Sequence, residues 1–481
     1  MNKKMVFSTL GKLTLSEAAL MILPLIVALI YGESKVAISF AITIGIALII
    51  GSLLYLCFRT KNKTIYAKEG FVIVAFGWLI MSAIGAIPFV MSGDIPSYVD
   101  AFFETVSGFT TTGASILTTF DGFSKGALFW RSFTHWLGGM GVLVFIMAIL
   151  PSISDRSIHI MRAEMPGPIV GKIVPRARET ARILYIIYFV FTLLETVLLW
   201  AGEMSLYESL LHAFGSVGTG GFGIKVDSIA SYTPYTQWVI TIFMFICGIN
   251  FNLFYLIIMK KFKSAIKSGE LWAYVGIALA SVAIISISIK SLYPNWNDAI
   301  RASSFQVSSV ITSTGFSTAD YNAWPTLSKT VLIVLMFIGA CAGSTGGGFK
   351  VARIVMLFKM IKQELRHVIH PRSVTAVKFE GKVVDKTILS SISSYLAIYL
   401  LFFAAAILLI SFEPFGFETN FTTALSCFNN MGTFFAGNNI GVGFNSYSDF
   451  SKIVLSFTML FGRLEIYPLL IALTPSTWTK K

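Results

Sequence analysis

Four times along this chain, two long apolar runs flank a short amphipathic stretch and a loop that contains glycine. The clearest copy has residues 71–91, the short stretch 97–107, the loop Thr111-Thr112-Gly113 and the run 129–150. The outer runs are long enough to cross a bilayer as helices, and the middle stretch is too short. Non-helical backbone at membrane depth is tolerated only where it is buried in protein or lines a water-filled path. The pattern therefore predicts re-entrant loops around a pore.

The other three copies keep the same order of first span, short stretch, loop and second span. They cover 183–200, 206–214, 218–222 and 238–259; then 271–289, 298–310, 313–317 and 331 to about 359; then 388–412, 420–428, 430–434 and 453–473. Two further runs, 15–31 and 36–58, precede the first copy and predict a helical hairpin. Internal repeats of spans indicate pseudo-symmetry, with the binding path on the axis.

These observations predict an all-α polytopic membrane protein with four pseudo-symmetric span–loop–span repeats and an N-terminal two-helix hairpin. The expected divisions are 1–63 for the hairpin, then 64–160, 161–265, 266–375 and 376–481 for the four repeats. The four cysteines are scattered singly, without metal-ligand or redox spacing, and are interpreted as packing residues.

Charge and composition fit the membrane class. Apolar residues make up 55% of the chain and charged residues only 13%, against about a quarter in ordinary globular domains. The mean hydropathy is +0.76. The net charge of +13 comes from Lys and Arg that lie mostly between apolar runs, which the positive-inside rule explains without nucleic acid. When the N-terminus is placed in the cytoplasm and the chain crosses the membrane ten times, every basic segment and both termini lie in the cytoplasm. All four loops then lie on the other side.

A loop of this kind can substitute backbone carbonyls for the hydration shell of an ion, with glycine permitting the required dihedral angles. The corresponding glycines are predicted to be Gly113, Gly220, Gly315 and Gly432. The short stretches before the loops are expected to be pore helices. Their C-terminal ends, each carrying about half an elementary negative charge, would favour a cation on the axis.

The motifs Thr111-Thr112-Gly113, Trp-Leu-Gly-Gly-Met-Gly at 136–141, Thr-Gly-Gly-Phe at 219–222 and Gly-Arg-Leu-Glu-Ile at 462–466 resemble the Trk/Ktr/HKT superfamily of potassium transporters. The N-terminal hairpin is similar to its TrkH/TrkG branch. The resemblance covers nearly the whole chain and implies four potassium-channel-like M1-P-M2 repeats with one filter glycine in each loop.

The resemblance also implies a set of residues whose carbonyls would contact potassium. They are Thr111, Thr112, Gly113, Thr219, Gly220, Thr314, Gly315, Met431 and Gly432. In plant members a serine at the first glycine accompanies sodium permeation, so Gly113 favours potassium. The fourth loop departs from the pattern with Asn430 and Met431, which predicts an asymmetric filter.

A second feature lies below the predicted filter, in the second span of the third repeat. The run is Gly343, Ser344, Thr345, Gly346, Gly347 and Gly348. Because each glycine costs about 1 kcal/mol relative to alanine inside a helix, a continuous helix is not expected here. We interpret the run as a gate, which matches the family's intramembrane loop.

Arg463 is an intramembrane arginine predicted to face the pore and donate to carbonyls of this loop. A local pair with Glu465 is the alternative, disfavoured because residues two apart on a helix point to different faces.

Other titratable residues carry weaker predictions. Glu104 is expected to bond locally and hold the filter, although intramembrane acids can also relay protons or bind a coupling ion; Glu195 has no assigned partner. Arg131 and His135 are interpreted as interfacial residues. His367 and His370 are interpreted as part of a solvated connector or docking surface. A G-x-G-x-x-G match at 218–223 follows no predicted strand and is rejected as a dinucleotide site.

The predicted function is potassium uptake across a bacterial cytoplasmic membrane through a gated pore, with potassium as the transported ion and no bound organic cofactor. The resemblance implies a homodimer controlled by a cytosolic TrkA-like nucleotide-binding ring. Its docking surface is expected at 350–386 and 156–182. A sodium- or proton-coupled symporter on the same scaffold is the first alternative. A membrane-embedded enzyme is the second, and no catalytic constellation in the sequence supports it.

Overall fold

The computed structural model describes residues 1–60, 66–141, 177–373, 376–433, 435 and 443–479. The fold is helical as predicted, with one small addition, a two-stranded antiparallel hairpin of β1 (Lys378–Phe379) and β2 (Lys382–Val383). Six of the described helices are long and apolar enough to cross a membrane, and two bent pairs could bring the number to eight. The chain is therefore an integral membrane protein.

The N-terminal hairpin is formed by α1 (Lys3–Leu20), α2 (Ile22–Ile30) and α3 (Ser34–Cys57). The first span begins well before the predicted residue 15, because Val6, Leu10 and Leu13 are buried and extend its packed face. Helices α1 and α3 approach closely, since a Cβ on Gly11 would lie 2.7 Å from the carbonyl oxygen of Gly51. Small residues allow such close approach between membrane helices.

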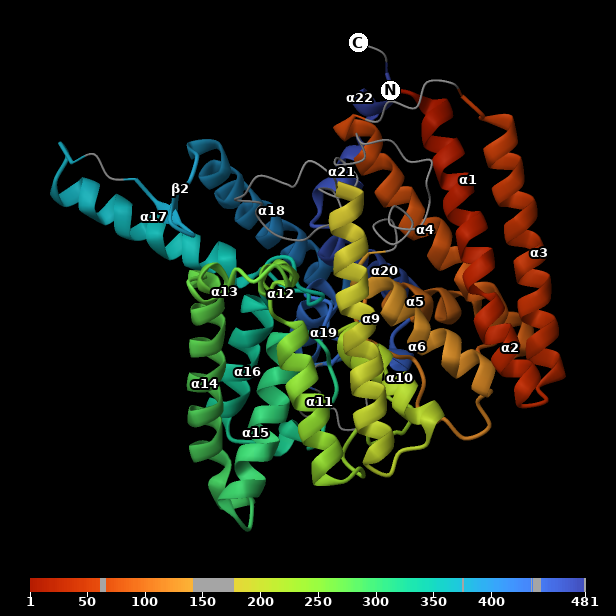
Figure 1. Ribbon diagram of the computed structural model, residues 1–481, viewed down its shortest axis with the longest axis horizontal. Helices are drawn as coiled ribbons and strands as arrows, with labels where there is room; N and C mark the ends of the chain where they lie inside the picture. The colour runs from red at the N-terminus through yellow and green to blue at the C-terminus, as the bar shows by residue number, and fades with distance from the viewer. Residues whose placement is uncertain (61–65, 142–176, 374–375, 434, 436–442, 480–481) are drawn as a thin grey trace.

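Each of the four repeats contributes a first span, a short helix and a second, divided span. The first spans are α4 (Ala67–Ser92), α9 (Ala177–Ala201), α14 (Gly269–Ile289) and α18 (Lys386–Ile410). The short helices are α5 (Tyr98–Phe109), α10 (Leu206–Val217), α15 (Trp296–Ile311) and α19 (Phe417–Phe428). The second spans begin as α6 (Lys125–Gly139), α11 (Pro234–Cys247), α16 (Thr326–Ile338) and α20 (Asp449–Arg463). Each short helix packs against both spans of its own repeat (Figure 1).

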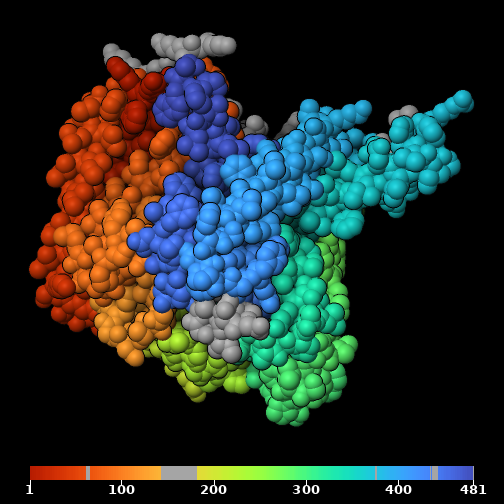
Figure 2. Space-filling model, turned by 180° about the vertical axis from the view of Figure 1, so that it is seen from behind, coloured from red at the N-terminus to blue at the C-terminus, as the bar shows by residue number. Residues whose placement is uncertain are grey.

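Packing between repeats follows a cyclic order. The second span of each repeat contacts the short helix of the next one: α6 packs on α10, α11 on α15, α16 on α19, and α20 on α5. The last of these contacts joins the fourth repeat to the first. Figure 2 shows the same closure on one face, where the orange first repeat lies beside the blue fourth repeat. The repeats therefore form a closed ring, as the repeat pattern predicts.

The second spans are more broken than the sequence suggests. In the third repeat the predicted break is present, because α16 ends at Ile338 and α17 (Val351–Ile369) begins only after the glycine-rich segment. The continuous spans predicted at 238–259 and 453–473 are wrong. The first is bent by 87° between α11 and α12 (Phe251–Ile258), and the second by 115° between α20 and α21 (Tyr467–Leu473). The predicted end of the first repeat's second span, residues 142–150, lies outside the described residues.

Each of the two unexpected bends has a local cause. In the fourth repeat, Glu465 and Ile466 have φ values of 55° and 67°, outside the helical region, and Pro468 stands in the first turn of α21. Proline is tolerated there but would break the interior of a helix. In the second repeat, Asn250 caps the N-terminus of α12 by accepting a hydrogen bond from the Asn252 amide at 3.0 Å.

The remaining short elements are α13 (Phe262–Ile266), η1 (Lys290–Leu292), η2 (Tyr321–Ala323), η3 (Phe444–Ser446) and α22 (Pro475–Trp478). Helix α17 and the β1–β2 hairpin project from the body of the protein (Figures 1 and 2).

Several first spans expose apolar side chains, among them Val197, Leu279 and Leu401. These exposed apolar side chains are suited to face lipid.

Candidate functional site

The four loops leave the short helices with one shared backbone conformation. The second residue after each helix has a positive φ; these are Thr111 (53°), Thr219 (53°), Ser313 (57°) and Asn430 (54°). Two residues later each loop has a glycine with positive φ; these are Gly113 (78°), Gly221 (75°), Gly315 (87°) and Gly432 (79°). The fourth loop follows the pattern in spite of its different side chains. Its departure from the other loops is one of side-chain chemistry, because the backbone is the same.

This conformation corrects the predicted register of the second loop. The Thr112 amide donates to the Ser107 carbonyl at 2.9 Å, and the Gly220 amide makes the same bond to Gly215 at 2.7 Å. Gly220 is therefore the counterpart of Thr112, and the counterpart of Gly113 is Gly221. The prediction of Gly220 as the equivalent glycine is wrong by one residue, because two consecutive glycines give no indication of which one takes the positive φ.

The four glycines lie against one another's loops in a closed cycle. A Cβ on Gly113 would collide with the carbonyl oxygen of Gly220, and a Cβ on Gly221 with that of Thr314. The cycle continues in the same direction. A Cβ on Gly315 would collide with the Met431 carbonyl oxygen, and one on Gly432 with the Thr112 carbonyl oxygen. Each of these glycines thus lies beside the carbonyl oxygen at the equivalent position of the next loop, and none of them has room for a side chain.

Hydroxyl pairs support two of the loops from within. In the first loop, the Thr110 and Thr112 hydroxyls are 2.7 Å apart, and in the third loop the Thr312 and Thr314 hydroxyls are 2.8 Å apart. Thr112 also accepts a hydrogen bond from the side-chain amide of Asn430 at 2.9 Å, which ties the fourth loop to the first. All of these groups are buried, where a satisfied polar network holds a unique arrangement.

Glu104 holds the outer end of the first loop, as predicted. Its carboxylate accepts hydrogen bonds from the Ser115 hydroxyl at 2.8 Å and the Ile116 amide at 2.9 Å, and it pairs with Arg131 at 2.6 Å. Arg131 also donates to the Gly223 carbonyl at 2.9 Å, so one ion pair connects the first and second loops.

The interpretation of Arg131 and His135 as interfacial residues is wrong. Arg131 is 2% exposed and His135 is fully buried. Both lie on α6 and pack against the second loop, with the Arg131 guanidinium 3.5 Å from the centre of the Phe222 ring. Sequence reasoning missed this because the two residues fall near the predicted start of an apolar run, where basic side chains usually reach the membrane surface.

Glu195, which had no assigned partner, is fully buried on α9 and accepts a 2.5 Å hydrogen bond from Ser216, near the end of α10. It therefore contacts the second short helix.

His367 and His370 are exposed near the end of α17, in keeping with a solvated connector. Among the described residues, no group of three or more His, Cys, Asp or Glu side chains is placed to hold a metal ion.

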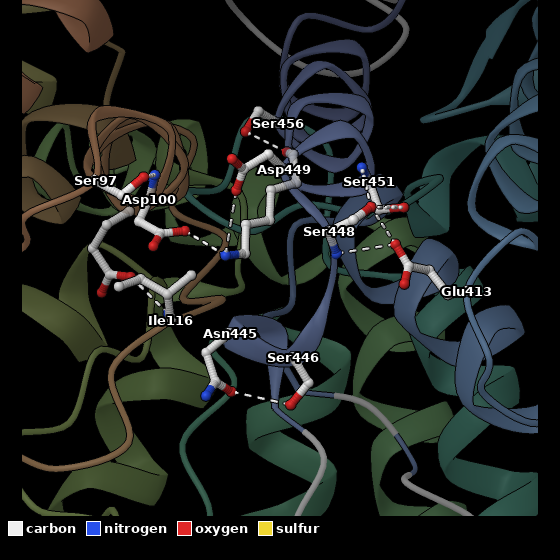
Figure 3. Close-up of polar contacts among 12 residues, drawn as sticks. Ser97, Asp100, Ile116, Glu413, Asn445, Ser446, Ser448, Asp449, Ser451 and Ser456 are labelled. Carbon is white, nitrogen blue, oxygen red and sulfur yellow. Dashed lines mark hydrogen bonds and ion pairs between the residues drawn. The ribbon is translucent and has the colours of Figure 1, made fainter.

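Polar contacts also join the first and fourth repeats near the starts of α5 and α20 (Figure 3). Lys452 of α20 pairs with Asp100 of α5 at 2.5 Å and lies 3.9 Å from Asp449. Glu413 accepts from the Ser448 amide at 3.0 Å and from its hydroxyl at 2.5 Å. Burial alone would raise the pKa of Glu413, but the bonds from Ser448 and Ser451 outweigh it and lower the pKa.

The glycine-rich segment lies against the loops. It runs without helix from residue 339 to residue 350, longer than the predicted 343–348, and Gly339, Gly343 and Gly348 have positive φ. The Gly347 amide donates to the Ser313 hydroxyl at 2.5 Å, which connects the segment directly to the third loop. Lys350, buried at 1% exposure, donates to the Gly346 carbonyl and closes the segment on itself.

The same segment is bound to the broken second span of the second repeat. The Cys341 amide donates to the Gly248 carbonyl at 3.1 Å, and the Phe251 amide donates to the Gly343 carbonyl at 3.0 Å. These bonds occupy backbone groups that a continuous helix in the second repeat would have used itself. The break between α11 and α12 therefore accompanies the glycine-rich segment.

Arg463 joins three repeats at one point, at the end of α20. Its guanidinium donates to the Thr345 carbonyl at 2.8 Å in the glycine-rich segment, as predicted. It also donates to the Gly138 and Gly139 carbonyls at 2.6 and 2.9 Å in the first repeat. Glu465, the alternative partner considered for Arg463, pairs with Arg353 at 2.6 Å.

Comparison with known proteins agrees with this architecture. A family model named TrkH and described as "Cation transport protein" matches residues 37–273 and 287–480. The Trk system potassium uptake protein TrkH of Escherichia coli K12 is 35% identical over 478 residues, covering 97% of this chain and 98% of that protein. The potassium uptake protein TrkG of the same strain is 32% identical and covers 95% of each chain.

A solved structure gives the same result in three dimensions. The crystal structure of the potassium transporter TrkH from Vibrio parahaemolyticus matches with a TM-score of 0.89 and 30% identity, over the full length of both chains. These relatives are named as transporters and not as enzymes. Because the family model and the relatives cover nearly the whole sequence, this chain belongs to the TrkH family of cation transport proteins.

Proposed function

We propose that this protein takes up potassium through a pore whose selectivity filter is the cycle of loop carbonyls. The observation that carries the proposal is the closed contact cycle between Gly113, Gly221, Gly315 and Gly432 and the carbonyls of the neighbouring loops. A ring of backbone carbonyls can replace the hydration shell of an ion. The full-length similarity to named potassium uptake proteins supports potassium as that ion.

The electrostatics of the short helices fit a cation. Helices α5, α10, α15 and α19 all end immediately before the loops. The C-terminus of a helix carries about half an elementary negative charge, so four such ends near one axis favour a cation and disfavour an anion. The Thr, Gly and Met side chains at the carbonyl positions add no charge of their own.

Gating would be the task of segment 339–350 and Arg463. The segment contacts the third loop through Ser313, and Arg463 holds its Thr345 carbonyl while binding the first repeat. A conducting state would require these bonds to be released, because they keep the segment against the inner side of the filter. A cytosolic nucleotide-binding partner acting on projecting α17 is a natural means of moving the segment, since α17 follows it directly.

The proposed orientation places the loops outside and both termini in the cytoplasm of a bacterial cell. The basic face of residues 350–386 would then meet the TrkA-like ring, and two copies of the chain would assemble side by side. The second part of the expected docking surface, residues 156–182, lies mostly outside the described residues. The positive-inside rule supports this orientation.

Growth of a potassium-uptake-deficient host on low potassium tests the filter. The parent chain with its partner should restore growth, and Gly113→Ser should not restore selective growth, because its side chain would collide with the Gly220 carbonyl. Gly122→Ser is the matched control. Gly122 has the same φ of 78°, but a Cβ there meets nothing within 4 Å. Failure of the parent chain to restore growth, or equal growth with Gly113→Ser, overturns the proposal.

A coupled symporter remains the second candidate, and Glu195 is the observation that favours it. This acid is fully buried in a membrane span, and buried ionisable groups mark ion and proton pathways. In proteoliposomes, a reversal potential that follows the potassium gradient alone supports the channel-like function. A reversal potential that shifts with an imposed sodium or proton gradient supports coupling, and Glu195→Gln should then abolish the shift.

A further inference from the structure

The second loop lacks two side chains that support the other loops. Gly218 stands where the first and third loops have Thr110 and Thr312, and Gly220 stands where they have Thr112 and Thr314. The second loop therefore cannot form the hydroxyl pair found in the first and third loops. Yet Gly220 has no positive φ, so its backbone would accept a side chain, unlike that of Gly221. Another part of the protein must exclude a side chain at residue 220.

The space beside Gly220 is filled by His135 of the preceding repeat. A Cβ added to Gly220 would collide with three atoms of the imidazole, Nδ1, Cε1 and Cγ. A Cβ on Gly218 would lie 2.7 Å from the His135 carbonyl oxygen. His135 thus fills the place beside Gly220 with its ring and, together with the Phe214 carbonyl, adjoins Gly218 with its backbone.

Packing alone holds the imidazole in this position. His135 is fully buried, its ring centre lies 4.0 Å from that of Phe222, and neither ring nitrogen has a hydrogen-bond partner among the described residues. Arg131, one turn earlier on α6, covers the same Phe222 ring. Phe222 follows Gly221 directly, so α6 fixes the second loop on both sides of its filter glycine.

We propose that His135 is a positioning residue for the second wall of the filter, supplying from the first repeat the side-chain volume that loop 2 lacks. The inference rests on the proposed function. It adds that the second wall depends on a neighbouring repeat, whereas the first and third walls are supported by their own threonines.

Met244 provides a matched comparison. Gly139 and Gly248 each pack against the start of the next repeat's loop, at Gly218 and Thr312, and His135 and Met244 lie four residues before them. Both side chains are fully buried on second spans. Met244, however, precedes a loop that has its own Thr312–Thr314 pair. Truncation of Met244 therefore removes a buried side chain at the equivalent helix position, before a loop that has its own support.

The test measures potassium and sodium flux into proteoliposomes, with thermal melting of the purified protein as the check on folding. His135→Ala should lower the potassium-to-sodium flux ratio by about fivefold, the factor that corresponds to one lost contact of ordinary strength. His135→Phe should keep the ratio, because the position requires volume and not a hydrogen bond. Met244→Ala should change it far less.

A double variant tests the space itself. Gly220→Thr alone should reduce selective uptake, because its side chain collides with His135, and adding His135→Ala should restore the ratio toward that of the parent. If the losses in the flux ratio caused by Gly220→Thr and His135→Ala simply multiply in the double variant, the inference is overturned. Equal losses in His135→Ala and Met244→Ala, or equal losses in the Phe and Ala variants at 135, would also overturn it. Gly113→Ser, run in parallel, reports separately on the filter, so its failure to alter selectivity would refute the proposed function instead.

Discussion

The ring of four loops and the glycine-rich segment 339–350 both depend on glycine, but they are built in opposite ways. The ring repeats one backbone conformation four times, and each contact runs between equivalent positions of neighbouring loops. The glycine-rich segment occurs once and is held by unrelated groups: the Ser313 hydroxyl, the Gly248 carbonyl and the Arg463 guanidinium.

With the proposed function, this difference separates two tasks. A closed cycle of backbone contacts leaves no loop free to move without its neighbours, which suits a fixed cage for an ion. Separate bonds from unrelated groups to a single segment can be released one at a time, which suits a barrier that opens. The most damaging changes should therefore fall in the ring, and the changes that increase flux should fall in the contacts of the segment.

Gly221→Ala should have the largest effect, because it combines a positive φ of 75° with a collision against the Thr314 carbonyl. We expect at least a tenfold loss of selective potassium uptake in proteoliposomes, the factor that about 1.4 kcal/mol produces. Gly122→Ala, with a φ of 78° and open space around it, is the control for backbone strain. Near-normal selectivity in Gly221→Ala would mean that the ring does not need glycine in this register.

Arg463→Ala should have the next largest effect, and in the opposite direction. Hydrogen bonds to charged groups contribute roughly 1.5–3 kcal/mol, so basal potassium flux should rise by about tenfold or more. Arg463→Lys should fall between the parent and the Ala variant, since a compact ammonium cannot bind the carbonyls of two other repeats at once as a guanidinium does. Basal flux equal to that of the parent in Arg463→Ala would remove this residue from the barrier.

Ser313→Ala tests a side-chain bond that connects the ring of loops to the glycine-rich segment. The Ser313 hydroxyl accepts from the Gly347 amide, and a buried hydrogen bond of this kind contributes about 1 kcal/mol. We expect basal flux to increase by roughly fivefold, with the potassium-to-sodium ratio unchanged. A changed ratio without increased flux would show that Ser313 acts in the filter instead of in the barrier.

The smallest effect is expected from the ion pair at the outer ends of the first and fourth repeats. Asp100 is 24% exposed where it pairs with Lys452, and pairs that reach solvent contribute about 0–1 kcal/mol. Asp100→Asn should lower the melting temperature slightly at low salt and hardly at all at high salt. A large loss at high salt would contradict this ranking and make the closure of the ring depend on this pair.

Much of this architecture was readable from the sequence. Membrane-length apolar runs, their four-fold repetition and the basic segments between them predicted the hairpin, the short helices and the order of elements. The glycine-rich run predicted a break in this span, and the isolated arginine at 463 predicted a bond to a carbonyl of that run, which the structure shows at Thr345. These predictions succeeded because hydropathy, glycine content and an intramembrane charge each impose a strong local cost that few structures can satisfy.

Other features had no sequence signal. Two adjacent glycines gave no reason to choose Gly221 over Gly220, and the bend after Arg463 depended on a turn at Glu465 and Ile466 that hydropathy does not reveal. The sequence predicted that His135 and Arg131 lie at the membrane interface, but both are buried against the second loop.

The sequence by itself determined what must be buried, where helix cannot continue and how often the unit repeats, because these depend on local residue chemistry. Only the tertiary structure decided which carbonyl faces which glycine, which repeat supports which loop and what Arg463 holds together. Those contacts join residues far apart in the sequence. Some of them, such as the bond from Asn430 to Thr112, form only when the fourth repeat closes against the first.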